Sequence, residues 1–146
     1  MGGPTEIRWA LGPEDRAGAL ALREDVFCGE QGVLPEEEVD GRDDDAEHLV
    51  AVDVATGAVV GTLRLLTDGA TAKIGRVAVA RERRREGIAL EMLGRALARA
   101  AEIGCTRAIL AAQTKATDVY RRAGFAVESG VFLEARIEHV WMARAL

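Results

Sequence analysis

Apolar and polar positions in the first 40 residues predict a short strand followed by a helix. Glu6–Ala10 is typical of a strand that opens a sheet. Pro13 and the two acidic residues after it mark a helix start, because proline suits the first turn and acidic side chains suit the positive end of the helix dipole. We expect this helix to run to about Phe27. The acidic segment that follows Pro35 is expected to form a loop or a short helix.

Three apolar segments separated by turn signals come next and predict an antiparallel meander. His48–Val54 is rich in valine and is followed by the turn pair Thr56-Gly57. Ala58–Leu66 is the second predicted strand, and Lys73–Val79 is the third. Because only short turns join these segments, neighbouring strands should run in opposite directions.

After Gly87 the apolar positions recur with the period of a helix instead of a strand. This helix is expected to end at Gly104, which stands where a C-cap glycine belongs. The elements predicted after it are a strand at Thr106–Ala112, a helix at Ala116–Ala123, and strands at Phe125–Val131 and Val140–Ala145. A strand, a crossover helix and a second strand make a parallel connection. The order predicts an α/β (α+β) fold: a single domain over residues 1–146, with a mixed, mostly antiparallel sheet of about six or seven strands flanked by helices.

Composition and charge argue against several classes of protein. Apolar residues make up 49% and charged residues 29% of the 146, which is a globular composition. The net charge of −5 argues against a nucleic-acid partner, whose binding rests on many cationic side chains. No apolar run approaches the roughly 20 residues that cross a bilayer, so no membrane partner is expected. The N-terminus does not resemble a signal peptide, so we expect a cytoplasmic protein. Two cysteines without a CxxC spacing and two distant histidines predict neither a disulfide framework nor a metal site.

The charges are unevenly distributed along the chain. Between Glu36 and Glu47, eight of twelve residues are acidic. This segment is either solvated surface or the lining of an entrance that attracts a cationic amine. Alternatively, Asp40 and Asp43 only cap turns and pair with Arg23 or Arg42. A basic cluster follows later, with arginines at positions 81, 83, 84 and 85.

The basic cluster leads directly into the helix that begins at Gly87, and this arrangement predicts an anion site. The first N–H groups of a helix have no partners inside the helix, and the helix dipole makes that end partly positive. Gly87 and Ala89 keep the approach to the backbone open for a phosphate, and a diphosphate is the natural ligand. The segment is neither a P-loop nor a GxGxxG turn. A basic helix start without any ligand is the alternative.

Two motifs give this site a more specific interpretation. Arg84-x-x-Gly87-x-Ala89 resembles the [Q/R]xxGx[G/A] signature with which the GCN5-related N-acetyltransferase (GNAT) superfamily binds the pyrophosphate of coenzyme A. Gln113 to Phe125, with Tyr120 between them, resembles the second hallmark of that superfamily, which usually has Asn in place of Gln113. The resemblance spans the whole domain and is strongest from Lys73 to Phe125.

Other segments are similar to the ElaA/YjcF-type branch of this superfamily. They are Arg23-x-x-Val26-Phe27-x-x-Glu30-Gln31-Gly32-Val33, Glu47-His48-Leu49 and Glu138-His139-Val140-Trp141-Met142. The first of these segments, with the acid-rich segment after it, is also similar to acyl-homoserine lactone synthases. Those enzymes carry a Trp soon after the Phe, where this chain has Glu30-Gln31-Gly32, and they lack the clear Arg84–Ala89 loop.

The resemblance implies roles for named residues. Backbone groups of Val77 and Val79 would meet the pantetheine amides, and the Ala78 region would face the thioester. Tyr120 would be the general acid that protonates the departing thiolate; the alternative is a helix tyrosine that packs on Phe125. The remaining residues implied in binding the cofactor are Arg84, Arg85, Glu86, Gly87, Ile88, Ala89 and Gln113.

The general base is left open by the sequence. The strand Lys73–Val79 has no acidic residue, where many relatives carry the base. The candidates are Glu30, Glu47, His48, Gln113 and His139, or an ordered water. Cys28 is a poor nucleophile, because it lies near the negative end of a helix.

The function implied is that of an N-acetyltransferase that uses acetyl-CoA as the acyl donor. The acceptor would be a small-molecule or peptide amine, and a homodimer is possible because dimers are common in this fold. A module that binds acyl-CoA without turnover is the alternative from another class, and a ligand-free interaction domain is a third.

Overall fold

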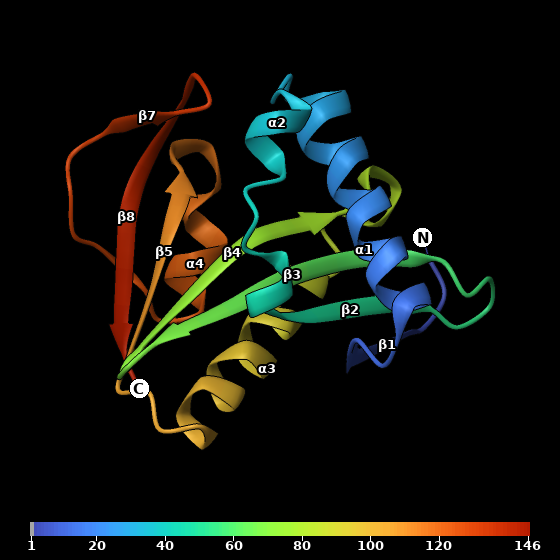
Figure 1. The fold of residues 1–146 in the computed structure, drawn as a ribbon, viewed down its shortest axis with the longest axis horizontal. Helices are drawn as coiled ribbons and strands as arrows, with labels where there is room; N and C mark the ends of the chain where they lie inside the picture. Colours follow the sequence, from blue (N-terminus) through green and yellow to red (C-terminus); the bar gives the residue numbers. More distant parts are fainter. Residues whose placement is uncertain (1) are drawn as a thin grey trace.

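A computed structural model describes residues 2–146, which form one mixed sheet with helices on both faces (Figure 1). The strand order is β1-β2-β3-β4-β5-β8-β6, and β7 also pairs with β8. All pairs are antiparallel except β4 with β5. The strands are β1 (Thr5–Trp9), β2 (Glu47–Asp53), β3 (Val59–Asp68), β4 (Thr71–Val79), β5 (Arg107–Gln113), β6 (Ala126–Val127), β7 (Phe132–Glu134) and β8 (Ile137–Ala145). The predicted meander and the parallel crossover are therefore confirmed.

The helices lie close to their predicted positions. They are α1 (Pro13–Arg23), α2 (Pro35–Glu38), α3 (Ile88–Glu102) and α4 (Thr117–Arg122), joined by a π-helical segment η1 (Glu24–Glu30) and the short 3₁₀ turns η2 (Asp43–Asp45), η3 (Arg81–Arg83) and η4 (Thr114–Ala116). The first predicted helix was expected to be regular to Phe27. Instead it widens into η1 after Arg23, which displaces the side chains of this segment relative to α1. Among residues 2–146, no helix is both long and apolar enough to cross a membrane.

One predicted strand was wrong. Phe125–Val131 was expected to be continuous, but only β6 lies within it; an irregular stretch follows, and β7 begins after it at Phe132. The cause is local: the backbone N–H of Trp141 donates to the hydroxyl of Ser129 at 2.9 Å, so a side chain takes the place of a ladder carbonyl. Residues 2–146 therefore form eight strands, where six or seven were expected.

Both faces of β3 are packed closely by helices. On one face, Gly61 lies so near α3 that a Cβ there would stand 2.9 Å from Cγ2 of Ile88. On the other face, Gly18 of α1 lies so near Val59 that a Cβ there would stand 2.5 Å from its Cγ2. The sheet is thus held between α1 and α3, and its C-terminal half with β5 and β8 extends beyond α1 (Figure 1).

The parallel pair β4 and β5 stays together only at its start. The register runs from Thr71–Arg107 to Lys73–Ile109 and then stops. Figure 1 shows the two strands meeting near the C-terminus and fanning apart toward α2. Beyond Lys73, β4 therefore has a sheet partner on its β3 side but none on its β5 side.

Candidate active site

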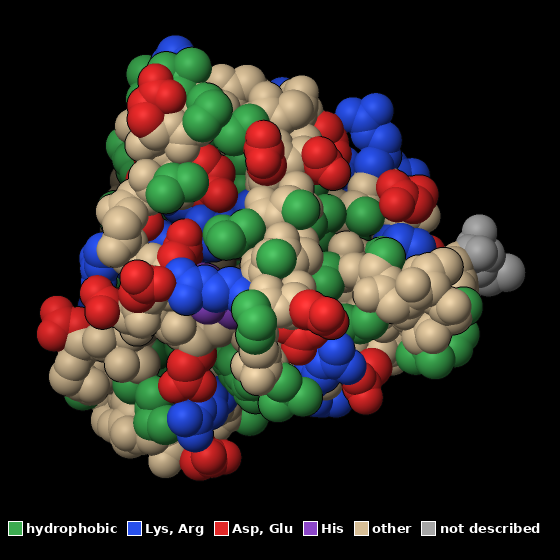
Figure 2. All heavy atoms as spheres, turned by 45° about the vertical axis from the view of Figure 1, so that its right-hand side comes forward, with side chains coloured by type: hydrophobic (Ala, Val, Ile, Leu, Met, Phe, Trp, Pro, Cys, Tyr) green, Lys and Arg blue, Asp and Glu red, His purple; other side chains and the backbone are tan. Residues whose placement is uncertain are grey.

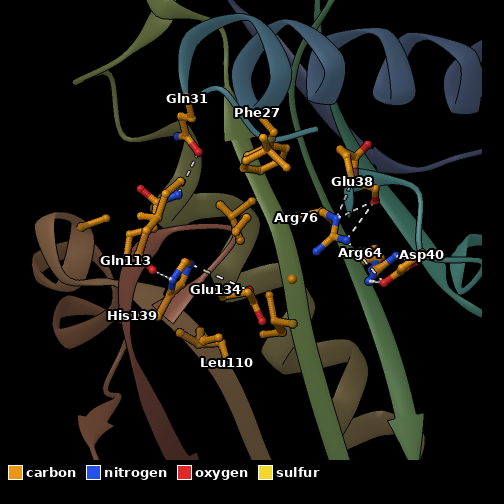
Figure 3. Close-up of a pocket in the computed structure, with 18 of the residues that line it drawn as sticks. Phe27, Gln31, Glu38, Asp40, Arg64, Arg76, Leu110, Gln113, Glu134 and His139 are labelled. Carbon is orange, nitrogen blue, oxygen red and sulfur yellow. Dashed lines mark hydrogen bonds and ion pairs between the residues drawn. The ribbon is translucent and has the colours of Figure 1, made fainter. Parts of the chain in front are cut away.

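A pocket of about 440 Å³ lies where β4 and β5 separate. Its walls come from η1 and α2 on one side and from β5, α4 and the β7–β8 hairpin on the other, with β4 between them (Figure 3). Because the pocket reaches both Phe27 on the α1 side of the sheet and Tyr120 on α4, it passes through the opening between the strands. A ligand in this opening would contact residues on both sides.

A bulge in β4 shapes the edge that faces the opening. Thr62 pairs with Ala78 and Arg64 pairs with Gly75, so the one residue between them on β3 lies opposite two residues on β4. Within the bulge, Arg76 has a φ of 52°, a left-handed conformation that is uncommon for a residue with a side chain. The bulge re-aims the backbone next to Val77, which lines the pocket. Of the other two residues predicted on this strand, Ala78 has a buried side chain and Val79 is half-buried.

The α2 wall of the pocket is a network of three arginines and three acids. Arg23 donates to Glu38 at 2.7 and 3.1 Å and to Asp43 at 2.8 and 3.2 Å. Arg64 donates to Asp40 at 2.8 Å and to Asp43 at 3.1 Å. The sixth member, Arg76, donates to the Glu38 carboxylate at 2.8 Å. Part of the acidic segment lines the pocket, and Asp43 pairs with Arg23, one of the two arginines considered as partners. Attraction of a cationic amine stays a prediction. Arg42 was the other arginine considered as a partner of Asp40 and Asp43. It contacts Asp40 through its backbone N–H, which donates to the Asp40 carboxylate.

The network holds Asp40 and Asp43 in the charged form. Hydrogen bonds from Arg64 keep the pKa of Asp40 well below its usual range, although partial burial opposes the shift. Burial alone would raise the pKa of Asp43, but hydrogen bonds from Arg23 and Arg64 outweigh it and lower that pKa. With three cations against three anions, this wall is electrically neutral.

Tyr120 lies on α4 and lines the pocket. Its side chain is buried and contacts Phe125 edge-on, with 6.5 Å between the ring centroids. Burial raises the pKa of the Tyr120 hydroxyl to about 12. The phenol is therefore protonated at neutral pH, which a general acid requires.

The loop before α3 has the backbone conformation that an anion site needs, but some of its arginines already form ion pairs with acidic side chains. Gly87 has a φ of 84° and precedes the first residue of α3, and Arg85 has a φ of 65°. Arg83 is buried and pairs with Asp53 at 2.7 Å and with Glu86 at 3.0 Å. Arg83 and Glu86 thus stabilise the loop. Figure 2 shows basic and acidic side chains intermingled over one face of the molecule.

The structure separates the candidates for the general base. Glu30 pairs with Arg84, and Glu47 pairs with Arg99 at 2.9 Å. His48 is buried, with Nε2 2.8 Å from the carbonyl oxygen of Asp43. None of these three lines the pocket, whereas Gln113 and His139 do. Nε2 of Gln113 donates to Oε1 of Gln31 at 2.9 Å, which joins β5 to the residue directly after η1 across the opening.

Sequence reasoning missed the β7–β8 hairpin. Glu134 lines the pocket, and Arg136 reaches across to Glu37 at 3.0 and 3.1 Å. The turn places Ala135 at φ 48° and Arg136 at φ 66°. Such a turn normally carries Asn or Gly, so the sequence here has no turn signal that would reveal the hairpin.

Comparison with known proteins identifies the class to which this fold and pocket belong. Residues 16–125 match the model of the acetyltransferase (GNAT) family, and the chain belongs to that family. It is 34% identical over 136 residues to the uncharacterized N-acetyltransferase YjcF of Bacillus subtilis, covering 92% of this chain and 96% of that protein.

Solved structures give the same classification. A putative N-acetyltransferase from Lactobacillus plantarum is 28% identical, with a TM-score of 0.89 and 99% of each chain covered. Escherichia coli ElaA is 25% identical, with a TM-score of 0.84 over 97% of this chain and 99% of that one. A Bacillus subtilis acetyltransferase in complex with CoA shares the fold at 17% identity, with a TM-score of 0.72 over 98% and 99% of the two chains. The predicted GNAT fold and the likeness to ElaA and YjcF are therefore confirmed.

Proposed function

We propose that this protein transfers the acetyl group of acetyl-CoA to a primary amine by direct attack of the amine on the thioester. The observation that carries the proposal is the pocket through the β4–β5 opening, which has a bulged strand edge on one side and a buried, protonated Tyr120 on the other. The match to the GNAT family supports the acyl donor, and so does the CoA complex of a protein with the same fold.

In this proposal the pantetheine arm lies along β4. The β5-facing edge of β4 has no sheet partner beyond Lys73, so backbone groups near Val77 and Val79 are placed to bind amides of the cofactor. The bulge at Arg76 changes the direction of the neighbouring backbone, where an N–H group can polarise the thioester carbonyl. One such donor is worth about 2.7–4 kcal/mol in related chemistry.

The diphosphate is proposed to bind at the amides of the loop from Arg84 to Ala89. Gly87 adopts a left-handed conformation, and the side chain of Arg85 is exposed. Gln113, at the end of β5, is proposed to contact the cofactor at the other side of the opening.

Direct transfer is favoured over an acyl-enzyme on Cys28. Burial and then the charge of Glu38 raise the pKa of the Cys28 thiol, which disfavours the reactive thiolate. In addition, Cys28 does not line the pocket.

Calorimetry followed by a thiol-release assay tests the proposal. Acetyl-CoA is expected to bind the wild-type protein and to fail to bind Gly87→Glu, because the new side chain places a negative charge in the phosphate site. Gly57→Glu is a matched control: Gly57 also has a positive φ (76°) but lies in the turn between β2 and β3. Binding should survive in that variant.

The assay then uses acetyl-CoA with 1,4-diaminobutane, tyramine and a dipeptide as probe amines. Release of CoA that depends on an amine is the expected result. Binding without release for every amine would favour a module that holds acyl-CoA without turnover. No binding at all would remove the proposal.

A further inference from the structure

His139 is held in the pocket by a contact that determines which ring nitrogen is free. Its Nδ1 lies 2.7 Å from the carbonyl oxygen of Ile137. A carbonyl only accepts hydrogen bonds, so Nδ1 must carry the proton and donate it. In the neutral ring, Nε2 is then the unprotonated nitrogen with a free lone pair.

The surroundings of Nε2 suit a proton acceptor. The His139 side chain is 8% exposed, and Nε2 lies 3.8 Å from Oε2 of Glu134, which also lines the pocket. Within residues 2–146, no hydrogen bond is made to Nε2. Figure 3 shows His139 and Gln113 on the same wall, opposite Arg76 and Glu38.

The ring is also fixed in orientation. Phe132 stacks on His139 with 5.8 Å between centroids and on Trp141 with 5.6 Å, and Nζ of Lys73 lies 5.4 Å from the Trp141 ring centroid. Lys73 also lines the pocket, and its ammonium lies over the Trp141 ring. Of the other charged groups on the hairpin and the facing α2, Arg136 pairs with Glu37, and Glu38 pairs with Arg23 and Arg76. Glu36 and Glu138 are exposed. Among residues 2–146, Glu134 is the acidic group that lies within 4.0 Å of Nε2.

We propose that His139 is the general base of the reaction, that it accepts the proton of the attacking amine at Nε2, and that Glu134 stabilises the imidazolium that forms. This inference rests on the proposed acetyl transfer and names the residue that the sequence left open. The exposed half of Glu134 links the pair to solvent, to which the proton is finally released.

The step balances as follows. The amine nitrogen attacks the thioester carbon, and the C–N bond forms while the C–S bond breaks. The proton lost by nitrogen goes to Nε2 of His139, and the leaving thiolate takes the proton of the Tyr120 hydroxyl. The products are the amide and CoA with a free thiol. Both side chains then regain their starting states by exchange with water.

The variant His139→Asn is the sharpest test, because the Asn amide can still donate to the Ile137 carbonyl but has no basic nitrogen. We expect kcat/KM for a probe amine to fall by about 100-fold or more, while acetyl-CoA affinity changes less than about twofold. Glu134→Gln should give a smaller loss. Glu138→Gln is the matched control. Glu138 lies on β8 next to His139, is exposed, and makes no ion pair within the described residues.

The pH dependence separates a base from a structural role. The ratio of wild-type to His139→Asn kcat/KM is taken with the same amine, so the ionisation of the amine cancels. If His139 is the base, this ratio depends on pH, because only the wild-type protein has the basic nitrogen that accepts the proton. A merely structural role would give a constant ratio and a lower melting temperature.

Nitrogen-15 NMR of the two histidines gives a readout that is independent of activity. The proposal expects the neutral His139 ring to carry its proton on Nδ1. A proton on Nε2, or full activity in His139→Asn, would contradict the role of His139 as the general base. Neither result would contradict the proposed acetyl transfer. Absence of turnover in the wild-type protein with every probe amine would overturn both.

Discussion

Arg84 and Glu30 form a two-point ion pair that joins the loop before α3 to the end of η1. Nη1 lies 3.0 Å from Oε2, Nη2 lies 2.8 Å from Oε1, and Nε donates to the carbonyl oxygen of Val79 at 3.0 Å. The hydrogen bonds from Arg84 lower the pKa of Glu30, so the pair is charged at neutral pH. One arginine of the proposed phosphate site is thus neutralised in the protein without ligand.

Removing this negative charge should strengthen cofactor binding. In Glu30→Gln, Arg84 keeps its bond to Val79 but no longer faces a carboxylate, so the potential at the phosphate site rises. We expect the Kd for CoA to fall by about two- to fivefold at low salt, the scale of an exposed ion pair, and the gain to shrink as salt is added. Calorimetry measures both. Glu14→Gln, an exposed charge on α1, is the control, and equal effects in the two variants would contradict the role of Arg84.

Tyr120→Phe should lower turnover without affecting the cofactor. The change removes the hydroxyl proton but keeps the ring that packs on Phe125. We expect kcat to fall by about 100-fold while the Kd for acetyl-CoA stays nearly constant. Because the pKa of Tyr120 is about 12, loss of this acid should not reduce the wild-type rate below strongly alkaline pH. Unchanged turnover in the variant would remove Tyr120 from the reaction.

Arg23 should be essential for stability, because it is a buried cation between two acids. Its side chain is 1% exposed, and Arg23→Met leaves Glu38 and Asp43 with only the pocket-side arginines. We expect the free energy of unfolding in urea to fall by about 3–5 kcal/mol. Arg16→Met is the comparison, because Arg16 forms an exposed pair with Asp44, and it should cost at most about 1 kcal/mol. Similar losses in the two variants would show that the buried network is not stabilised as described.

Acid should destabilise the protein through Asp40. Its pKa in the folded protein lies below its ordinary value of 3.8, so the unfolded chain binds this proton more readily. The contribution of Asp40 is therefore complete above about pH 5 and is lost as the pH falls below 4 and toward its folded pKa. Urea unfolding at a series of pH values should show a steep decline below pH 4, and the decline should be shallower in Asp40→Asn. Parallel curves for the two proteins would refute the assignment.

The predicted elements came within a few residues of the observed ones wherever a local pattern was present. The 3.6-residue period after Gly87 and the turn signal at Thr56-Gly57 concern neighbours in the chain, so they can be interpreted without tertiary contacts. The failures had local causes with no sequence signal: the Ser129 hydroxyl interrupts a strand, and Ala135 and Arg136 form a turn without Gly or Asn.

Local patterns in the sequence predicted only some of the residues that line the pocket. Tyr120 was identified by its motif position, and the structure places it in the pocket. Glu134 had no motif, and His139 was one base candidate among several. Glu134 and His139 lie close together because the hairpin pairs β7 with β8, and no local pattern in the sequence indicates this hairpin.

The amino-acid sequence alone determined the order of the strands and helices up to α4, the glycine-led start of α3 and the family resemblance, because each of these is encoded in residues close together in the chain. The tertiary structure decided which charges are free and which are paired. Arg84 meets Glu30 across 54 positions, and Arg64 meets Asp43 across 21. The opening between β4 and β5 has the same origin: it exists because two strands separated by a helix pair for only three residues before they part.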